Sequence, residues 1–162
     1  MELKDLIKPN LILSGLSAET NQEALEQIVE HLMKEGYVEE GYLQMLLERE
    51  KKYPTGLCTM PFAVALPHTE SDHILKPCIA ITKLKKPVGF YEMVNDKNMI
   101  QVHYIFNLVL QKTEQQLELL QILIGIFSNE KIMKILEKED EPEKIAEILL
   151  SLQKSKTINR KE

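Results

Sequence analysis

The order of the expected elements predicts an α/β fold, with a single mixed sheet of about five strands flanked by helices on both faces. Amphipathic helical segments lie before, between and after the predicted strands. The segment from Ile100 to Leu110 is almost continuously apolar or aromatic, which is typical of a central strand covered on both faces. The 162 residues suffice for one hydrophobic core, and no internal repeat or linker interrupts them.

The first part of the chain predicts an edge strand and two helices. The strand is expected at the apolar run Leu11–Leu13. Thr20 and Glu23 form a capping-box pattern, and apolar residues at helical spacing follow until Gly36. A second helical segment ends before Pro54, because a proline disfavours helical geometry in the residue before it.

The rest of the chain predicts the remaining strands and three helices. Thr113 begins the first of these helices and forms a possible capping box with Gln116. Its apolar residues cover a wide arc, so we expect this helix to be well buried. A short helix starts at Ser128, and Pro142 fits the first turn of the last one. The predicted strands before the central one are Phe62–Leu66, Cys78–Thr82 and Pro87–Phe90.

Composition limits the class of protein. A hydrophobic content of 44% and a charged content of 28% are ordinary for a globular domain, expected at residues 1–152 with a short polar tail at 153–162. No stretch approaches the roughly 20 apolar residues that span a bilayer, and no signal peptide is recognised, so we expect a cytoplasmic protein. The net charge of −5 argues against nucleic-acid binding. Cys58 and Cys78 are expected to be reduced.

His68 is the principal candidate for chemistry. It follows Pro67, which has no N–H to donate and should end the strand ladder. An imidazole at a rigid strand end suits a proton carrier, a metal ligand or a phosphoryl acceptor. The structural alternative is a loop histidine that caps a neighbouring backbone group. His73 lies nearby, but the spacing matches no zinc motif, so no metal site is predicted.

The run Ala63-Val-Ala-Leu-Pro-His-Thr69 resembles the active-site segment of enzyme IIA of the sugar phosphotransferase system, fructose–mannitol superfamily. The upstream segments Leu46-Leu-Glu-Arg-Glu50 and Tyr53-Pro-Thr-Gly56 are also similar to that family. So is the order of a long strand followed by an amphipathic helix from Thr113. The similarity covers roughly residues 5 to 150. It implies the mannitol-type enzyme IIA fold.

The resemblance has one departure in the late helix. Mannitol-type members carry a second histidine near the start of that helix, where this chain has Gln116. The segment Glu114–Leu120 is more similar to the galactitol-type branch, which also has glutamine there. Thr69 likewise replaces the glycine that is common after the active-site histidine of mannitol-type members.

Arg49 continues the row that begins at Tyr42, at spacing i, i+3, i+4 and i+7, so its cation is expected on the core-facing side of the helix. With the resemblance, the guanidinium is interpreted as stabilising a phosphoryl group beside His68. A salt bridge to Glu50 or Glu70 is the structural alternative.

Gln116 has two interpretations of equal weight. Its side chain can donate a hydrogen bond to the His68 ring or to a phosphoryl oxygen, at a helix amino terminus that favours anions. The capping box with Thr113 is the other interpretation. The loop at Thr55-Gly56 is similarly open: its backbone N–H groups can approach a phosphoryl group, or it can be a plain turn.

The resemblance implies a phosphocarrier that needs no metal and no organic cofactor. His68 would accept a phosphoryl group from the phosphohistidine of HPr, on Nε2, and pass it to a cysteine of a cognate enzyme IIB. That protein would serve the membrane component enzyme IIC for uptake of galactitol or a related sugar or polyol. Two alternatives stay open: a regulatory module phosphorylated on His68 without a transport role, and a binding domain that is not phosphorylated.

Overall fold

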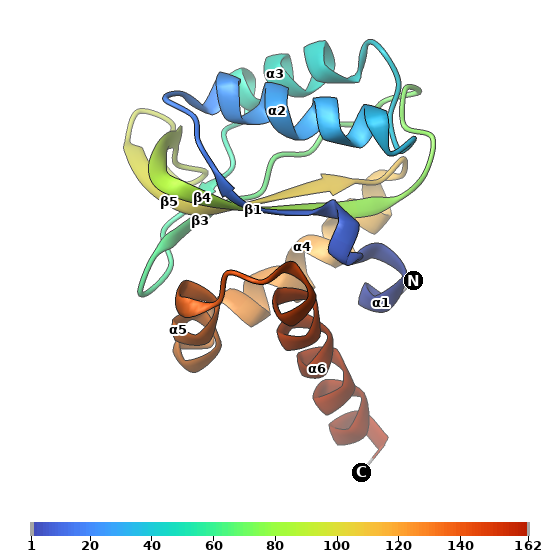
Figure 1. Cartoon of the computed structure of the whole chain (residues 1–162), viewed down its shortest axis with the longest axis vertical. Coiled ribbons are helices and arrows are strands. Elements are labelled where there is room, and N and C mark those ends of the chain that lie inside the picture. Colours follow the sequence, from blue (N-terminus) through green and yellow to red (C-terminus); the bar gives the residue numbers. More distant parts are fainter. Residues whose placement is uncertain (1, 162) are drawn as a thin grey trace.

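The computed structural model describes the backbone of residues 2–161 and the side chains of residues 2–152. Helices and strands alternate along the chain (Figure 1). The helices are α1 (Leu3–Leu6), the short 3-10 helix η1 (Pro9–Leu11), α2 (Asn21–Lys34), α3 (Tyr42–Lys52), α4 (Thr113–Phe127), α5 (Glu130–Lys138) and α6 (Pro142–Lys161). The strands are β1 (Ile12–Leu16), β2 (Gly56–Leu57), β3 (Ala63–Ala65), β4 (Cys78–Tyr91) and β5 (Met99–Val109).

The five strands form one mixed sheet in the order β1-β4-β5-β3-β2. β4 and β5 pair antiparallel over most of their length, while β1 joins β4 and β3 joins β5 in parallel. β2 pairs antiparallel with β3 at the far edge. The predicted central strand is confirmed, because β5 lies in the middle of the order. The edge strand near the amino terminus is confirmed as well.

Helices cover both faces of the sheet, as predicted. In Figure 1, α2 and α3 lie on one face, and α1, α4, α5 and α6 lie on the other. Each face has its own apolar cluster, because successive residues of a strand point to opposite sides of the sheet. On β3 and its flanks, Phe62, Val64 and Leu66 face the layer of α4, whereas Ala63 and Ala65 face the layer of α3.

Two predicted strands are parts of one long strand. Cys78–Thr82 and Pro87–Phe90 were expected as separate elements, but β4 runs continuously through both. Its pairing with β5 shifts register between Lys83 and Val88. A proline is tolerated at such an irregularity because it has no N–H to contribute to the ladder.

The helix ends follow the predictions in part. Thr20 accepts the N–H of Glu23, as in a capping box, but the Glu23 carboxylate bonds the N–H of Glu19 instead of the cap residue. The prediction of a capping box at the start of α4 is wrong. Lys112 is the cap residue, Thr113 is already helical, and no side chain caps that end. The wide apolar arc of α4 is buried only in part. The exposed side chains Leu117 (57%) and Ile124 (38%) form an apolar stripe along its outer face.

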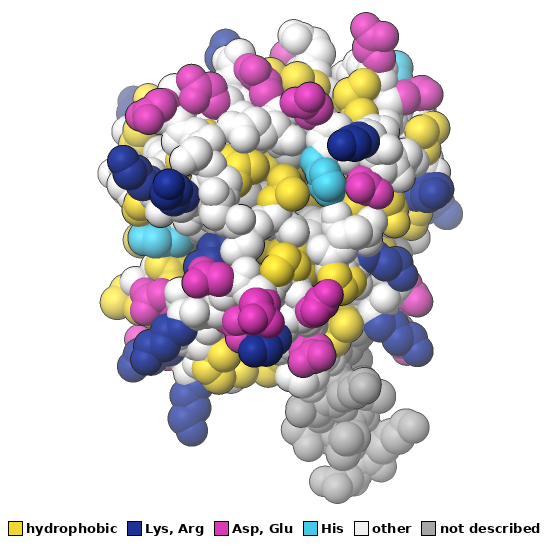
Figure 2. Space-filling view, in the orientation of Figure 1, with side chains coloured by type: hydrophobic (Ala, Val, Ile, Leu, Met, Phe, Trp, Pro, Cys, Tyr) yellow, Lys and Arg dark blue, Asp and Glu magenta, His cyan; other side chains and the backbone are white. Residues whose placement is uncertain are grey.

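The last helix runs to Lys161, so it includes the backbone of residues 153–161 of the predicted tail; the side chains of 153–162 lie outside the described residues. Among the described residues, no helix combines the length and apolarity needed to cross a membrane. The face shown in Figure 2 mixes acidic and basic side chains with small groups of exposed hydrophobic ones.

Candidate functional site around His68

The central strand fixes the backbone that carries His68. The carbonyl oxygen of Pro67 accepts the N–H of Leu108 in β5 at 3.0 Å and the side-chain amide of Asn107 at 3.0 Å. That amide also donates to the Tyr42 hydroxyl of α3. His68 therefore lies beyond the end of β3, in a segment whose backbone is still hydrogen-bonded to β5.

The ring of His68 is held by its own backbone. Nδ1 lies 2.7 Å from the carbonyl oxygen of Leu66, which can only accept, so Nδ1 carries the proton. Nε2 then bears the lone pair, and within residues 2–152 it has no hydrogen-bond partner. The side chain is half-buried. The arrangement presents one nucleophilic nitrogen at the protein surface.

The surroundings favour the neutral ring. Burial lowers the pKa of His68 below its ordinary value of 6.5, and the positive charge of Arg49 lowers it further, while the bond to the Leu66 carbonyl raises it. A neutral imidazole is the nucleophilic form. The site thus keeps that form over a wider pH range than a free histidine would.

Arg49 is near His68 but is not where the helical row predicted it. Its side chain is exposed, and its guanidinium carbon lies 4.4 Å from the centroid of the Tyr53 ring. No carboxylate lies within ion-pair distance of it among the described side chains, so the predicted alternative of a salt bridge to Glu50 or Glu70 is not formed. Its charge is available to a ligand.

The buried row of α3 runs through Tyr42, Leu46 and Glu50 instead, at spacing i, i+4 and i+8. Because successive residues of an α-helix are about 100° apart, this row drifts by about 40° at each step, away from Arg49. The helix therefore buries a carboxylate, Glu50, and leaves the neighbouring cation at the surface.

Glu50 starts a chain of hydrogen bonds that leads to His68. It is 8% exposed, and its carboxylate accepts the N–H of Thr55 at 2.8 Å and the Thr55 hydroxyl at 2.7 Å. Thr55 in turn accepts the N–H of Leu66, through both its carbonyl and its hydroxyl oxygen, each at 3.2 Å. The carbonyl of Leu66 holds the His68 ring. Burial raises the pKa of Glu50 from 4.5 to about 7, although the bonds from Thr55 oppose the shift.

Backbone groups of the loop at Thr55-Gly56 therefore already have hydrogen-bond partners within the protein. The N–H of Thr55 donates to Glu50 and is not free to approach a phosphoryl group. Gly56 lies in β2, paired with Ala65, and its carbonyl oxygen accepts the N–H of Met93. An added side chain at Gly56 would come within 2.6 Å of the Tyr91 carbonyl oxygen, so close backbone packing explains this glycine.

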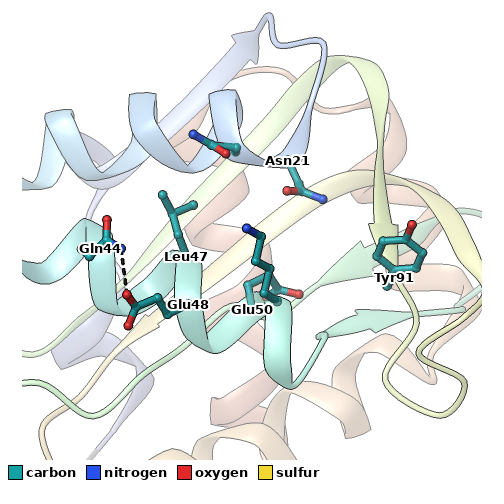
Figure 3. Close-up of a pocket in the computed structure, with 8 residues that line it drawn as sticks. Asn21, Gln44, Leu47, Glu48, Glu50 and Tyr91 are labelled. Atoms are coloured by element: carbon teal, nitrogen blue, oxygen red, sulfur yellow. Dashed lines mark hydrogen bonds between the residues drawn. The ribbon is translucent and has the colours of Figure 1, made fainter.

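Glu50 also borders a cavity of about 380 Å³ between the start of α2, α3 and the end of β4. Figure 3 shows Asn21, Glu50 and Tyr91 around it, with Gln44 bonded to Glu48 on the outer surface of α3. His68 does not line this cavity.

Gln116 lies next to the histidine loop. It is buried, and its amide nitrogen donates to the carbonyl oxygens of Leu110 at 2.9 Å and Thr69 at 3.3 Å. In this structure the amide thus fastens the residue that follows His68 to the start of α4. Its contact with the His68 ring or with a phosphoryl group stays a prediction.

Other candidate ligands are dispersed. His73 pairs with Glu39 at 3.3 Å. Cys58 is exposed and Cys78 is buried, and both are free thiols. Within the described residues, no three His, Cys, Asp or Glu side chains gather as a metal centre.

Sequence reasoning singled out His68, Arg49 and Gln116, whose roles stay predictions, but it did not single out Glu50 or Asn107, which the structure buries beside the histidine loop. The spacing of four residues from Tyr42 through Leu46 contained a signal for Glu50, because it extends the buried row by one more step. Asn107 had no comparable signal, since its partners at Tyr42 and Pro67 are distant in sequence.

Comparisons with known proteins identify the family of this chain. Residues 5–152 match the family model described as phosphoenolpyruvate-dependent sugar phosphotransferase system, EIIA 2. The galactitol-specific EIIA component of Escherichia coli (strain K12) is 30% identical over 125 residues, which cover 77% of this chain and 83% of that protein.

Solved structures share the fold. The crystal structure of IIA mannitol from Escherichia coli superposes with a TM-score of 0.74 at 26% identity, covering 88% of this chain and 98% of that one. The complex of enzyme IIAMTL with phosphorylated enzyme IIBMTL from Escherichia coli gives a TM-score of 0.72 at 26% identity, covering 90% and 97%. With its mixed sheet, its free histidine nitrogen and a family match over most of its length, this chain belongs to the EIIA 2 family of the phosphoenolpyruvate-dependent sugar phosphotransferase system.

Proposed function

We propose that this chain is a phosphocarrier in which Nε2 of His68 accepts a phosphoryl group from the phosphohistidine of HPr and passes it to a cysteine of an enzyme IIB. One observation carries the proposal: the bond from Nδ1 to the Leu66 carbonyl leaves a lone pair on a surface-facing Nε2. We place the reaction in the cytoplasm, with enzyme IIC as the membrane component that enzyme IIB serves.

The transfer balances without a cofactor. The Nε2 lone pair attacks phosphorus while the N–P bond of the donor histidine breaks, and the donor ring recovers its electron pair. The His68 ring, still protonated on Nδ1, then carries a positive charge that the Leu66 carbonyl oxygen stabilises. Attack by a cysteine thiolate on phosphorus breaks the new N–P bond and returns the neutral ring.

Positive charge beside the ring supports the transfer. Arg49 has no carboxylate partner in the described structure, and a planar guanidinium suits phosphoryl oxygens. Its pairing with the Tyr53 ring gives it a defined position at the surface. Gln116 holds the opposite side of the histidine loop, and its amide can turn from Thr69 toward a phosphoryl oxygen.

A docking surface for partner proteins adjoins this site. The apolar stripe of α4, with Leu117 and Ile124, begins one residue after Gln116, which contacts the histidine loop. Exposed apolar side chains beside a reactive group suit transient protein contacts. The complex of enzyme IIAMTL with phosphorylated enzyme IIBMTL makes an enzyme IIB the proposed acceptor. The similarity to a galactitol-specific component makes galactitol or a related polyol the proposed sugar.

The direct test is phosphorylation in a purified system. The chain is incubated with phosphoenolpyruvate, enzyme I and HPr, and its intact mass is measured. We expect one acid-labile phosphoryl group on the native chain and on a His73→Ala control, and none on His68→Ala. A native chain that stays unmodified under conditions that phosphorylate HPr would contradict the proposal and favour a binding domain.

A second step separates transport from regulation. The phosphorylated chain is mixed with a galactitol-type enzyme IIB, and loss of the phosphoryl group is followed over time. Rapid transfer supports the transport role. A stable phosphorylated chain would instead favour a regulatory module that is phosphorylated on His68.

A further inference from the structure

We propose that Glu50 and Thr55 are positioning residues for His68, acting through Leu66 to hold the imidazole ring in the orientation that presents Nε2. This inference rests on the proposed function of His68. Neither side chain contacts the ring. Both act on the backbone group that the ring depends on.

The Leu66 carbonyl needs such support because of its place in the chain. The ring is only as well oriented as the oxygen that accepts its Nδ1 proton. The next residue is Pro67, which cannot extend a ladder through an N–H, and β3 itself ends at Ala65. Leu66 therefore depends on other partners on its N–H side.

Thr55 supplies those partners. The N–H of Leu66 is shared between the carbonyl and hydroxyl oxygens of Thr55, which adds one more pair to the short ladder between β2 and β3. The hydroxyl can accept from Leu66 with a fixed lone pair only while its own proton is directed elsewhere. The Glu50 carboxylate directs it, since Oε1 accepts that proton at 2.7 Å.

Glu50 is suited to this role by its own fixation. It occupies the last buried position of α3, and its second oxygen accepts the Thr55 N–H. The two bonds hold both the backbone and the side chain of Thr55. A bond that served only to close the turn after α3 would require the Thr55 N–H alone, so the additional hydroxyl contact points to the Leu66 side.

The test uses two substitutions with matched controls. Thr55→Val removes the hydroxyl and keeps the shape of the side chain, while Thr55→Ser restores the hydroxyl. Thr59→Val is the control, because the Thr59 hydroxyl also donates a hydrogen bond, to the Phe62 carbonyl, but lies outside the chain of bonds to His68. Glu50→Gln leaves one acceptor oxygen for two donors, and Glu48→Gln on the exposed side of α3 is its control.

The readout is the tautomer of His68, measured by the nitrogen chemical shifts of its ring, together with the rate of phosphoryl acceptance from phospho-HPr. In folded Thr55→Val and Glu50→Gln we expect a detectable population protonated on Nε2 and a rate lowered roughly tenfold. Thr55→Ser, Thr59→Val and Glu48→Gln should keep the native tautomer and rate. An unchanged tautomer in folded Thr55→Val and Glu50→Gln would overturn the inference.

The tautomer measurement does not require phosphorylation. If the native chain accepts no phosphoryl group, the proposed function fails, while the nitrogen shifts still report whether Glu50 and Thr55 orient the ring. If Thr55→Val or Glu50→Gln does not fold, its native-like amide spectrum will be absent, and the other of these two variants, compared with its own control, then decides the question.

Discussion

The two faces of the sheet are built differently. The layer of α4 to α6 packs aromatic rings, with Tyr104, Phe106 and Phe127 in successive ring contacts. The layer of α3 buries polar groups instead, including Glu50 and Asn107. Both of these side chains hold backbone around His68, and Gln116 of α4 does so on the other face, whereas Phe106 and Phe127 pack against each other. The aromatic rings thus chiefly provide stability, while buried polar side chains hold the backbone around His68.

The largest expected effect lies in the aromatic layer. Phe106 is fully buried, and its ring centroid lies 4.8 Å from that of Phe127. Phe106→Ala should lower the free energy of unfolding by about 3–5 kcal/mol, through lost burial and a cavity. Urea unfolding followed by circular dichroism measures this. At low urea, the folded fraction should accept phosphoryl groups at the native rate. A folded Phe106→Ala variant that accepts phosphoryl groups more slowly than the native chain would show that the aromatic layer also affects the site.

Ionisation of Glu50 in the polar layer should lower the free energy of unfolding as the pH rises. The pKa of Glu50 is raised to about 7, so its stabilising contribution is complete below pH 4.5 and is lost as the pH rises through 7. Between pH 5 and 8 the native chain should lose on the order of 2 kcal/mol of unfolding free energy relative to Glu50→Gln. Urea titrations at several pH values test this. Parallel stability profiles for the two proteins would show that Glu50 ionises as freely as an exposed glutamate.

A substitution of Arg49 should affect phosphoryl acceptance without affecting stability. Because its side chain is exposed and has no ion-pair partner among the described residues, Arg49→Ala should change the unfolding free energy by less than about 0.5 kcal/mol. Phosphoryl acceptance should fall at least about tenfold, since a charge that stabilises the transferred group is lost. Lys52→Ala, which removes the other cation near the Tyr53 ring, serves as the control. Equal rates for both variants would remove Arg49 from the site.

The smallest expected effect is the titration of His68. Burial, with a further contribution from Arg49, lowers its pKa, so the neutral ring should persist below pH 6.5. The associated stability is present above pH 6.5 and is lost as the pH falls through the folded pKa. A proton NMR titration should give a midpoint below 6.5, shifted upward in Arg49→Ala. A native midpoint above 6.5 would mean that the charged ring is favoured.

The sequence predicted the fold well because its strongest signals are local. The apolar run of β5 and the proline at the start of α6 act within their own segments, and the structure agrees with both. The long strand β4 was divided in the prediction because Pro87 suggests a break. Its pairing with β5 is a tertiary effect that overrides this local signal.

The site was only partly predictable for the same reason. His68 was identified from a strand end and a family resemblance, but the bond that selects Nε2 depends on the conformation of Leu66-Pro67-His68. On α3, both rows from Tyr42 fit a helix, and only the packing against β3 decides that Glu50 is buried and Arg49 exposed. Neighbouring positions on one helix thus took opposite environments that spacing alone does not distinguish.

Nε2 of His68 is the proposed phosphoryl acceptor. Its most direct test is a proton–nitrogen correlation spectrum of the enzymatically phosphorylated, nitrogen-labelled chain, which identifies the modified ring atom. We expect a phosphoryl group on Nε2 of His68, with Nδ1 still protonated and bonded to the Leu66 carbonyl. A phosphoryl group on Nδ1, or on any residue other than His68, would contradict it.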